Sequence, residues 1–469
     1  MEVLQRTANR GSISTGYDID NSVKLEADNT EFFSRTPSSN TNRQTFTYST
    51  WVKRTELGIN GAILDAYQDG ANFFLLQFDT SDRFVAYQID SGTDYGYHYT
   101  RRYRDTAAWY HIVFVSDTTN GTASDRYQLY VNGERISNSD VDTDYGTPPQ
   151  NYNNNLNSTI LHSIGKRGDG AIYNSCYLAE THLVDGTALA PTAFGEFDED
   201  SGIWKPIEVD VTYGTNGFYL NYITASNMGN DKSGENNDFA ENNIAAADHS
   251  TDTPTNNFCT LNPILTNAGS ANYLTMTEGA TKSVNAGNAY RLAVGSIGVT
   301  SGKWYWEVKA TSVGATMYMG ITYPSVWDAD YTLGGTIFLD DNNDPVRYNA
   351  SGRSSFGSAF GNGDIIAFAL DMDASTPTMT VYKNNSSLGD LMSGLSIGGT
   401  GTAYLPPKED GYFPKVGGYG AMTFECNFGG YTSGTPSSAA SDANGYGTFE
   451  YAPPSGYYAL CTKNLAEYG

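Results

Sequence analysis

Short runs of β-branched and aromatic residues, each ended by turn residues, occur in two separate parts of the chain. The runs are Thr45–Arg54, Trp109–Val115 and Tyr127–Gly133 in the first part, and Gly302–Val308, Gly363–Asp371 and Tyr412–Pro414 in the second. Residues two apart lie on the same face of a strand, so the alternation at Phe46, Tyr48, Thr50 and Val52 indicates one buried face. A sustained helical period of 3.6 residues is missing. The sequence therefore predicts an all-β protein with two tandem antiparallel β-sandwiches.

Composition and charge limit the size of the fold and the kind of partner. The 469 residues are enough for two or three domains of ordinary size. The 27 basic and 52 acidic residues give a net charge of −25. Such an acidic surface repels phosphate backbones, so we expect no nucleic-acid partner. It suits a partner with cationic patches or divalent cations, and it would equally keep a tyrosine-rich chain soluble.

The termini and cysteines indicate where the chain is made. The first 16 residues, MEVLQRTANRGSISTG, lack an apolar segment and do not resemble a signal peptide. We find no run approaching the roughly 20 apolar residues of a membrane helix. Cys176, Cys259, Cys426 and Cys461 show no metal-ligand spacing, so they are predicted to be buried thiols rather than disulfides. These features indicate synthesis in a reducing cytoplasm and release without a secretion signal.

The chain divides into five predicted segments. Residues 1–20 are a polar leader, 21–224 a first domain and 258–430 a second domain. The Asn/Asp/Gly-rich residues 225–257 are interpreted as a linker or an ion-bound loop. Residues 431–469 form a C-terminal tail, in which Phe449–Pro454 is expected to be extended and docked. Asn132 and Gly133 predict a tight hairpin in the first domain.

Both domains resemble known families. The first is similar to the concanavalin A-like, laminin-G-like lectin jelly roll. The residues that carry this resemblance are Trp51–Arg54, Trp109–Val113, Leu129–Gly133, Leu178–Glu180 and Leu183–Gly186. The second domain resembles a SPRY domain. The residues that carry this resemblance are Gly302–Val308, Gly363–Ile366, Met379–Asn384 and Tyr412–Pro414.

The order of the motifs resembles a family of bacteriophage tail-fibre and virion-surface proteins. From the N-terminus to the C-terminus, the motifs are Ser34–Ser39, Tyr213–Leu220, Asp252–Pro263, the SPRY-like domain and Tyr451–Gly456. The resemblance implies host attachment or virion decoration, with the protein made in the host cytoplasm and located on the virion surface. Heptads and β-helical repeats typical of long fibre shafts are missing from the sequence. A stubby fibre or a distal knob, held on the particle by the leader, is therefore expected.

Candidate catalytic groups are few. Glu26, Asp28 and Glu31 match an E-x-D-x-x-E spacing of some glycoside hydrolases, in which paired carboxylates flank the sugar bond. Here the intervening residues favour a turn, so these acids are predicted to lie in a solvated loop. The acidic run Glu196–Ser201 lacks its last acid, and no G-x-S-x-G nucleophile elbow follows a strand. His111 and His182 are interpreted as strand residues. We therefore predict no catalytic residues and a protein that is not an enzyme.

Tyrosines in one predicted strand suggest a sugar-binding site. Tyr95, Tyr97 and Tyr99 share one face of an extended segment, Gly96 would leave room beside them, and Arg101 follows. Lectins stack aromatic rings on the apolar face of a pyranose and bind its hydroxyls with polar groups. We therefore predict glycan binding by these four side chains. The alternative is that the tyrosines only cover a sheet.

Loops of the second domain suggest a protein-contact surface. The residues expected there are Trp327, Asp328, Tyr331, Tyr348 and Arg353. SPRY domains bind peptides or proteins through such loops, so the resemblance implies a protein partner. Trp304 and Trp306 are instead expected in the core of the second domain.

An oxygen-rich loop is a candidate calcium site. Asp231, Ser233, Asn236 and Asp238 supply hard oxygen ligands around a glycine, although their spacing is not that of an EF-hand. Lys232 opposes a cation here. An ordinary Asn/Asp-rich turn is the alternative, and no other cofactor is expected.

The function predicted from these features is adhesion to host-cell surface polysaccharide by a tail-fibre-type subunit. We expect a homo-oligomer, with a trimer as the leading hypothesis, because multivalency strengthens weak sugar contacts. A capsid- or tail-decorating protein that contacts other virion proteins is the alternative. A polysaccharide depolymerase is the third hypothesis. Membrane insertion is not expected.

Overall fold

The computed structural model describes residues 16–264, 274–324, 337–340, 346–349, 352–397, 404–405, 407–431, 434 and 436–469. Two compact units divide the chain, a first unit of Ser14–Thr255 and a second unit of Asn256–Gly469. Each unit is built from mainly antiparallel sheets, so the all-β class and the two tandem sandwiches are confirmed.

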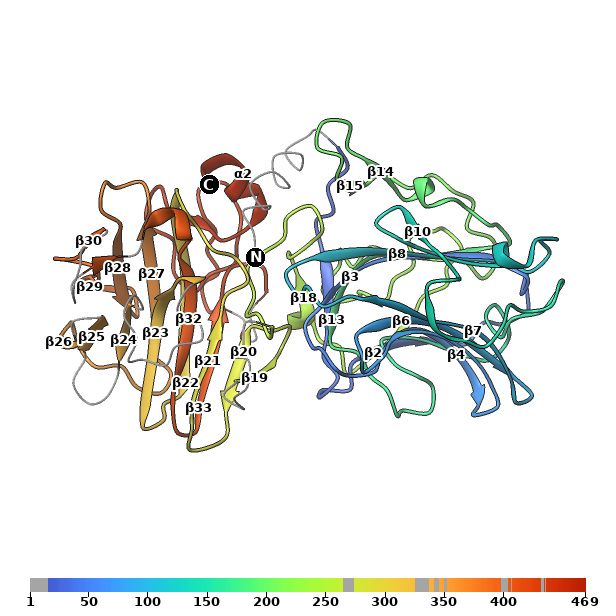
Figure 1. Ribbon diagram of the computed structural model, residues 1–469, viewed down its shortest axis with the longest axis horizontal. Helices are drawn as coiled ribbons and strands as arrows, with labels where there is room; N and C mark the ends of the chain where they lie inside the picture. The colour runs from blue at the N-terminus through green and yellow to red at the C-terminus, as the bar shows by residue number, and fades with distance from the viewer. Residues whose placement is uncertain are drawn as a thin grey trace. The chain divides into compact units, whose positions relative to one another are not determined.

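The first unit contains two large sheets that lie face to face (Figure 1). Sheet A has the order β10 (Glu134–Ile136), β9 (Tyr127–Val131), β8 (Trp109–Asp117), β3 (Thr45–Arg54), β13 (Cys176–Asp185), β1 (Ser22–Leu25) and β18 (His249–Ser250), with β16 (Phe218–Leu220) paired to β13. Sheet B has the order β11 (Val141–Asp144), β7 (Thr93–Arg102), β6 (Arg83–Asp90), β5 (Asn72–Phe78), β4 (Gly61–Asp69), β12 (Leu161–Ile164), β2 (Phe32–Arg35) and β17 (Ala240–Asn242). A separate hairpin joins β14 (Gly195–Phe197) to β15 (Trp204–Pro206), and the 3₁₀ turns are η2 (Ala123–Asp125), η3 (Pro191–Ala193) and η4 (Ala246–Asp248).

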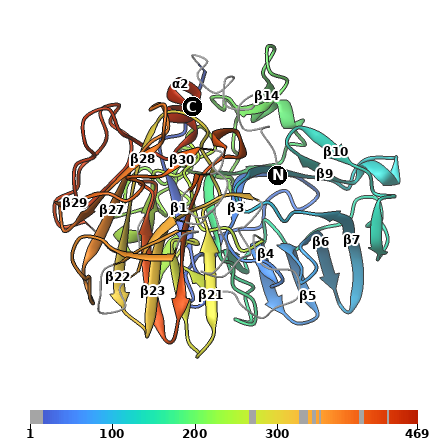
Figure 2. The same cartoon turned by 60° about the vertical axis from the view of Figure 1, so that its left-hand side comes forward.

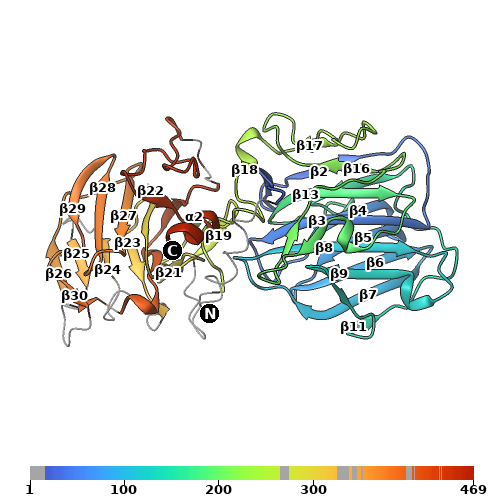
Figure 3. The same cartoon turned by 90° about the horizontal axis from the view of Figure 1, so that it is seen from above.

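The period-two pattern decides which side chains fill the space between the sheets. Phe46 of β3 contacts Phe74 of β5 across the core, with 5.7 Å between ring centroids. Figure 3 shows the strands of both layers from above. Burial of such rings contributes on the order of 1.5–3 kcal/mol each, which is why alternating apolar residues determine the register.

The hairpin predicted at Asn132 and Gly133 is present between β9 and β10. Their φ angles are 49° and 79°, the left-handed conformation that a two-residue turn of this kind requires. A Cβ at Gly133 would also lie 2.3 Å from the Trp204 ring, so only glycine fits beneath that side chain.

Residues 225–255 of the predicted linker 225–257 are part of the first unit, and residues 256–257 belong to the second, which differs from the prediction. Strand β17 pairs with β2, and β18 pairs with β1. The segment therefore completes one edge of each sheet. Residues 16–20, predicted as leader, also pack on this unit, since the Tyr17 hydroxyl donates to Glu180 Oε2 at 3.1 Å. The rest of the predicted leader lies outside the described residues.

The second unit contains two further sheets (Figure 2). Sheet C has the order β19 (Thr275–Thr277), β20 (Lys282–Asn285), β33 (Met422–Asn427), β22 (Lys303–Ser312), β27 (Ile365–Asp371), β28 (Thr378–Lys383) and β29 (Ser386–Asp390), with β34 (Tyr458–Ala459) parallel to β22. Sheet D has the order β21 (Tyr290–Val294), β32 (Phe413–Tyr419), β23 (Thr316–Thr322), β24 (Ile337–Asp340), β25 (Val346–Asn349) and β26 (Gly352–Ser355). The pair β30 (Ser396–Ile397) and β31 (Tyr404–Leu405), the 3₁₀ turn η6 (Lys408–Asp410) and helix α2 (Thr462–Tyr468) complete the unit.

Tryptophans and the C-terminal segment stabilise the second unit. Trp304 and Trp306 are buried, as predicted, and the Trp306 ring stacks on Phe368 at 5.2 Å. The predicted tail is integrated into the unit, because β34 pairs with β22 and the buried Phe449 ring meets Tyr305 edge-on at 5.1 Å.

The four cysteines are free thiols in buried positions, as predicted. Burial raises the pKa of Cys461 to about 12, so this thiol stays protonated at neutral pH.

Candidate functional site

An aromatic surface lies on the face of sheet B that points away from the sandwich core. On β5, β6 and β7 the core takes Phe74, Ala86 and Tyr97. Their sequence neighbours Phe73, Tyr87 and His98 therefore lie on the opposite face. We call the set Tyr67, Phe73, Tyr87, His98 and Tyr145 the aromatic patch.

The rings of the aromatic patch form a continuous series across the strands. Centroid distances are 5.9 Å for Tyr67–Phe73, 5.7 Å for Phe73–Tyr87, 5.0 Å for Tyr87–Tyr145 and 5.5 Å for His98–Tyr145. Tyr145 is 36% exposed, Tyr67 and Tyr87 are half-buried, and Phe73 is buried beneath them. The patch crosses from β4 to the residue after β11, about 19 Å at the usual strand spacing.

Charged groups border the aromatic patch. Arg83 donates to Asp79 at 2.8 Å and to Asp142 at 2.6 Å, and His98 Nδ1 lies 4.0 Å from Asp79 Oδ2. Burial lowers the pKa of His98 below its usual value, with Asp79 acting against that effect. Burial raises the pKa of Tyr87, and Asp94 beside it adds to the shift. The patch thus offers uncharged rings at neutral pH with polar groups at its edge.

Rings and polar groups in this arrangement can stack on pyranose faces and hydrogen-bond sugar hydroxyls. The Arg167 guanidinium lies 5.1 Å from the centroid of Phe73 and 2.6 Å from Asp169 Oδ2, so it adds donors at the β4 side. Sequence reasoning placed no member of the aromatic patch in a binding site.

The predicted glycan site of Tyr95, Tyr97, Tyr99 and Arg101 is not an exposed platform. Tyr97 and Tyr99 are 2% and 0% exposed and belong to the core between the sheets. Tyr95 is half-buried against Tyr152, with 5.0 Å between ring centroids. Arg101 is exposed over Tyr103. The tyrosines share one strand face, as predicted, but that face points inward.

Gly96 also differs from its predicted role of leaving space for a ligand. A Cβ at this position would lie 2.1 Å from the carbonyl oxygen of Ala86. Its φ of 124° is left-handed, and it pairs with Gly146 and Tyr145 through backbone hydrogen bonds of 3.0 Å each. Gly96 therefore serves close strand packing.

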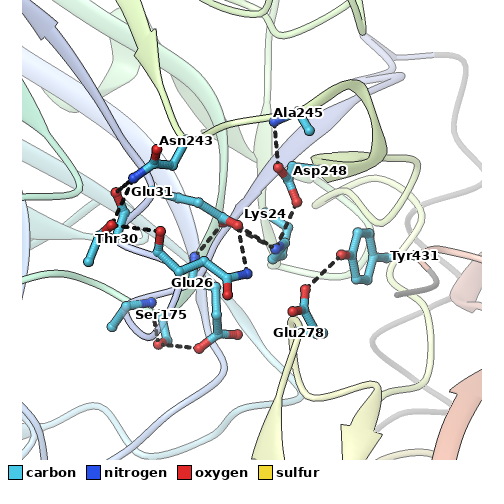
Figure 4. Close-up of polar contacts among 12 residues, drawn as sticks. Lys24, Glu26, Thr30, Glu31, Ser175, Asn243, Ala245, Asp248, Glu278 and Tyr431 are labelled. Atoms are coloured by element: carbon cyan, nitrogen blue, oxygen red, sulfur yellow. Dashed lines mark hydrogen bonds and ion pairs between the residues drawn. The ribbon is translucent and has the colours of Figure 1, made fainter. Parts of the chain in front are cut away.

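Two carboxylates of the E-x-D-x-x-E motif, Glu26 and Glu31, are buried, contrary to the predicted solvated loop, whereas Asp28 is exposed as predicted (Figure 4). Glu26 and Glu31 are 3% and 2% exposed. Lys24 Nζ lies 3.1 Å from Glu31 and 2.7 Å from Asp248 Oδ1. Glu26 accepts a hydrogen bond from Ser175 Oγ at 2.9 Å. The segment around Asp248, more than 200 residues away in the sequence, covers the motif.

His111 is a buried strand residue, as predicted, and its tautomer is determined by its neighbours. Trp204 Nε1 donates to His111 Nδ1 at 2.9 Å, and an indole nitrogen can only donate. The proton of neutral His111 is therefore on Nε2, which lies 2.8 Å from Ser49 Oγ. His111 donates to Ser49 and cannot act as its base. His182 of β13 is likewise buried, with Nδ1 2.8 Å from the Tyr213 hydroxyl.

The predicted calcium loop is a network of backbone contacts. Asp231 accepts hydrogen bonds from the Tyr219, Ser233 and Asn237 amides at 2.8–2.9 Å. Asp238 Oδ1 accepts from the Asp231 amide at 2.8 Å, while Asn236 is exposed with a φ of 60°. The described residues contain no group of three or more His, Cys, Asp or Glu side chains placed to hold a metal. Calcium binding by Asp231, Ser233, Asn236 and Asp238 stays a prediction.

Three of the predicted protein-contact residues, Trp327, Asp328 and Tyr331, lie outside the described residues. The backbones of Tyr348 and Arg353 pair directly across β25 and β26. This places the two residues at neighbouring positions of the edge hairpin of sheet D, and their role in protein contact stays a prediction.

Buried titratable groups of the first unit predict how its stability depends on pH. Burial raises the pKa of Asp65 from 3.8 to about 8 and that of Glu31 from 4.5 to about 7, and it lowers the pKa of His111 from 6.5 to about 3. The carboxyl contributions are complete at low pH and are lost as the pH rises toward 8. The histidine contribution is present above pH 6.5 and is lost as the pH falls.

Between pH 4.5 and 6.5 the two carboxyl losses outweigh the single histidine gain, so these three groups predict that the free energy of unfolding of the first unit is largest at about pH 4 and declines toward pH 8. The Asp65→Asn variant, which keeps an oxygen for the Gly168 amide, should lose much of the decline above that pH. Urea unfolding between pH 4 and 9 measures the free energy of unfolding of the wild type and of the Asp65→Asn variant. An alkaline decline as steep in the variant as in the wild type would contradict this assignment.

Comparison with known proteins agrees with the fold of the first unit. Residues 28–187 match the model of the concanavalin A-like lectin/glucanases superfamily. This part of the chain therefore has the concanavalin A-like lectin fold. A search of curated proteins finds no match to this sequence.

Several solved structures are similar to parts of this chain. A putative carbohydrate binding protein from Bacteroides ovatus is 16% identical, with 47% of this chain and 57% of that chain covered and a TM-score of 0.31. Domains LG4-5 of the mouse laminin α1 chain are 11% identical, with coverage of 87% and 89% and a TM-score of 0.29. The SPRY domain of human HERC1 is 19% identical, with coverage of 32% and 89% and a TM-score of 0.25.

Within the described part of the chain, no helix is both long and apolar enough to cross a membrane.

Proposed function

We propose that this protein is an adhesive, carbohydrate-binding protein whose first unit binds polysaccharide through the aromatic patch. The observation that carries the proposal is the series of rings on the outer face of sheet B, of which Tyr145 is the most exposed. Large exposed rings cost solubility, and a sheet face without a ligand is more often polar. The lectin fold of residues 28–187 supports the same function.

Removing one ring of the patch is expected to weaken polysaccharide binding. Tyr87→Ala or Tyr145→Ala should each reduce affinity about threefold to tenfold, because an aromatic contact contributes roughly 0.5–1.5 kcal/mol beyond its area. Tyr290→Ala is the matched control, since Tyr290 and Tyr419 form a similar ring pair at 5.1 Å in the second unit. Isothermal titration with the polysaccharide that binds the wild type measures the effect. Equal losses of polysaccharide affinity in the patch variants and in Tyr290→Ala would contradict the proposed site.

We further propose that the protein acts on the surface of a virion as a tail-fibre-type subunit that attaches to host polysaccharide. The order of its sequence motifs supports this role, and a homotrimer would present three patches to one cell surface. Virion decoration, with contacts to other virion proteins through the second unit, is the alternative.

Binding of the fluorescently labelled protein to intact bacteria separates these roles. Saturable binding that isolated surface polysaccharide competes away, without released oligosaccharide, supports the tail-fibre role. Release of oligosaccharide would identify a depolymerase instead. Absence of binding to any host, together with labelling of purified virions by specific antibody, would favour the decorating role.

A further inference from the structure

Charges around the aromatic patch define the class of polysaccharide that it can accept. Both arginines at its border are paired with carboxylates, Arg83 with Asp79 and Asp142, and Arg167 with Asp169. Arg83 is shared by two carboxylates, so that cluster is net negative.

Two further carboxylates adjoin the patch. Asp94 lies beside Tyr87, and Asp144 immediately precedes Tyr145 and accepts a hydrogen bond from the Gly146 amide at 2.7 Å. The border thus has five aspartates against two arginines, and His98 is held neutral by burial.

Two other cations lie near the border. Lys166 Nζ lies 4.1 Å from the centroid of Phe32 on β2, which β12 separates from β4. Arg102 is exposed and pairs with Arg83 across β7 and β6. With Arg102 counted, five aspartates face three arginines, so a sugar carboxylate or sulfate at the patch would meet net repulsion.

We propose that the aromatic patch selects uncharged polysaccharide and discriminates against acidic polysaccharide of the same backbone. This selectivity rests on the proposed carbohydrate-binding function. Stacking and hydroxyl hydrogen bonds supply the affinity, and the aspartate border supplies the discrimination.

The test compares neutral polymers with their own carboxymethylated forms. Dextran, mannan and galactan are screened for binding to the full chain, and each is also tested after carboxymethylation. We expect a neutral polymer to bind at least about tenfold more tightly than its derivative at roughly 0.01 M salt. The difference should shrink at about 1 M salt, where the Debye length falls from about 30 Å to about 3 Å.

One border variant and its control sharpen the comparison. Asp142 is exposed, so Asp142→Asn should keep the fold and should improve binding of the carboxymethylated polymer about twofold to threefold relative to the neutral polymer. Asp410→Asn, at an exposed position of the second unit, should leave the ratio of the two affinities unchanged.

The outcomes test the selectivity separately from the proposed carbohydrate binding on which it rests. Acidic polymer that binds as tightly as neutral polymer, or a ratio that neither salt nor Asp142→Asn changes, overturns the selectivity and leaves carbohydrate binding in place. Binding of neither class would contradict carbohydrate binding itself.

Discussion

Replacing Lys24 with methionine is expected to destabilise the first unit by about 3–5 kcal/mol. Lys24 is fully buried and lies 3.1 Å from Glu31 and 2.7 Å from Asp248. The substitution removes the only cation of this ion triad and leaves two carboxylates in the interior. The loss should be larger at pH 8 than at pH 5, because Glu31, whose pKa burial raises to about 7, is protonated at the lower pH.

Lys205→Met is the matched control for that prediction. Lys205 also pairs with two acids, at 3.3 Å from Glu196 and 3.1 Å from Asp198, but its side chain is 26% exposed. Ion pairs accessible to solvent contribute about 0–1 kcal/mol, so this variant should unfold nearly as the wild type does. Calorimetry and urea unfolding measure both variants. Equal destabilisation by the two substitutions would contradict the distinction between buried and exposed ion pairs.

Tyr99→Ala is expected to cost about 3–5 kcal/mol of stability without a specific loss of polysaccharide affinity. Tyr99 is 0% exposed in the core, and its ring lies 5.9 Å from that of Tyr97. Tyr99→Phe removes only the hydrogen bond to Asn138 Oδ1 at 3.2 Å, so it should cost about 0.5–1.5 kcal/mol.

Tyr145→Ala should give the opposite result, with stability nearly unchanged and affinity reduced, because its side chain is at the surface. Unfolding and binding are measured on the same preparations under conditions where every variant is folded. Weaker binding by folded Tyr99→Phe, with wild-type binding by Tyr145→Ala, would contradict the aromatic patch. That result would support a glycan site on the inner face of β7.

Local sequence patterns predicted much of this fold. Alternation in Thr45–Arg54 correctly predicted a strand, and Asn132 and Gly133 correctly predicted a tight turn. Both features depend only on residues that are close together in the sequence. The same alternation could not say which face of Thr93–Arg102 is buried. Period two defines two faces, and the choice between them depends on which sheet packs against the strand.

The aromatic patch could not be predicted for the same reason. Its rings come from four strands and the residue after a fifth, and the sequence does not specify their order in sheet B. One usable signal was present, since His98 alternates with Tyr97 and Tyr99 on β7. If the tyrosine face is buried, the His98 face is exposed, and the ring of Tyr87 on the adjacent β6 lies 6.4 Å from that of His98.

Burial of Glu26 and Glu31 was unpredictable because it depends on a distant segment. The turn between β1 and β2 has the composition of a solvated loop, yet η4 and β18 fold over it. The pairing of β17 and β18 explains why residues 225–255 belong to the first unit and are not a linker. Composition indicates whether a segment can be a loop, whereas the edges available in the sheets decide whether it becomes a strand.

Hydrogen–deuterium exchange with a saturating neutral polysaccharide tests most directly whether the aromatic patch is the carbohydrate site. We expect slower exchange on bound protein in β6, β7 and β11 of sheet B, in residues 83–102 and 141–147, and little change in sheet A or the second unit. Protection confined to the second unit or to sheet A would contradict carbohydrate binding by the aromatic patch.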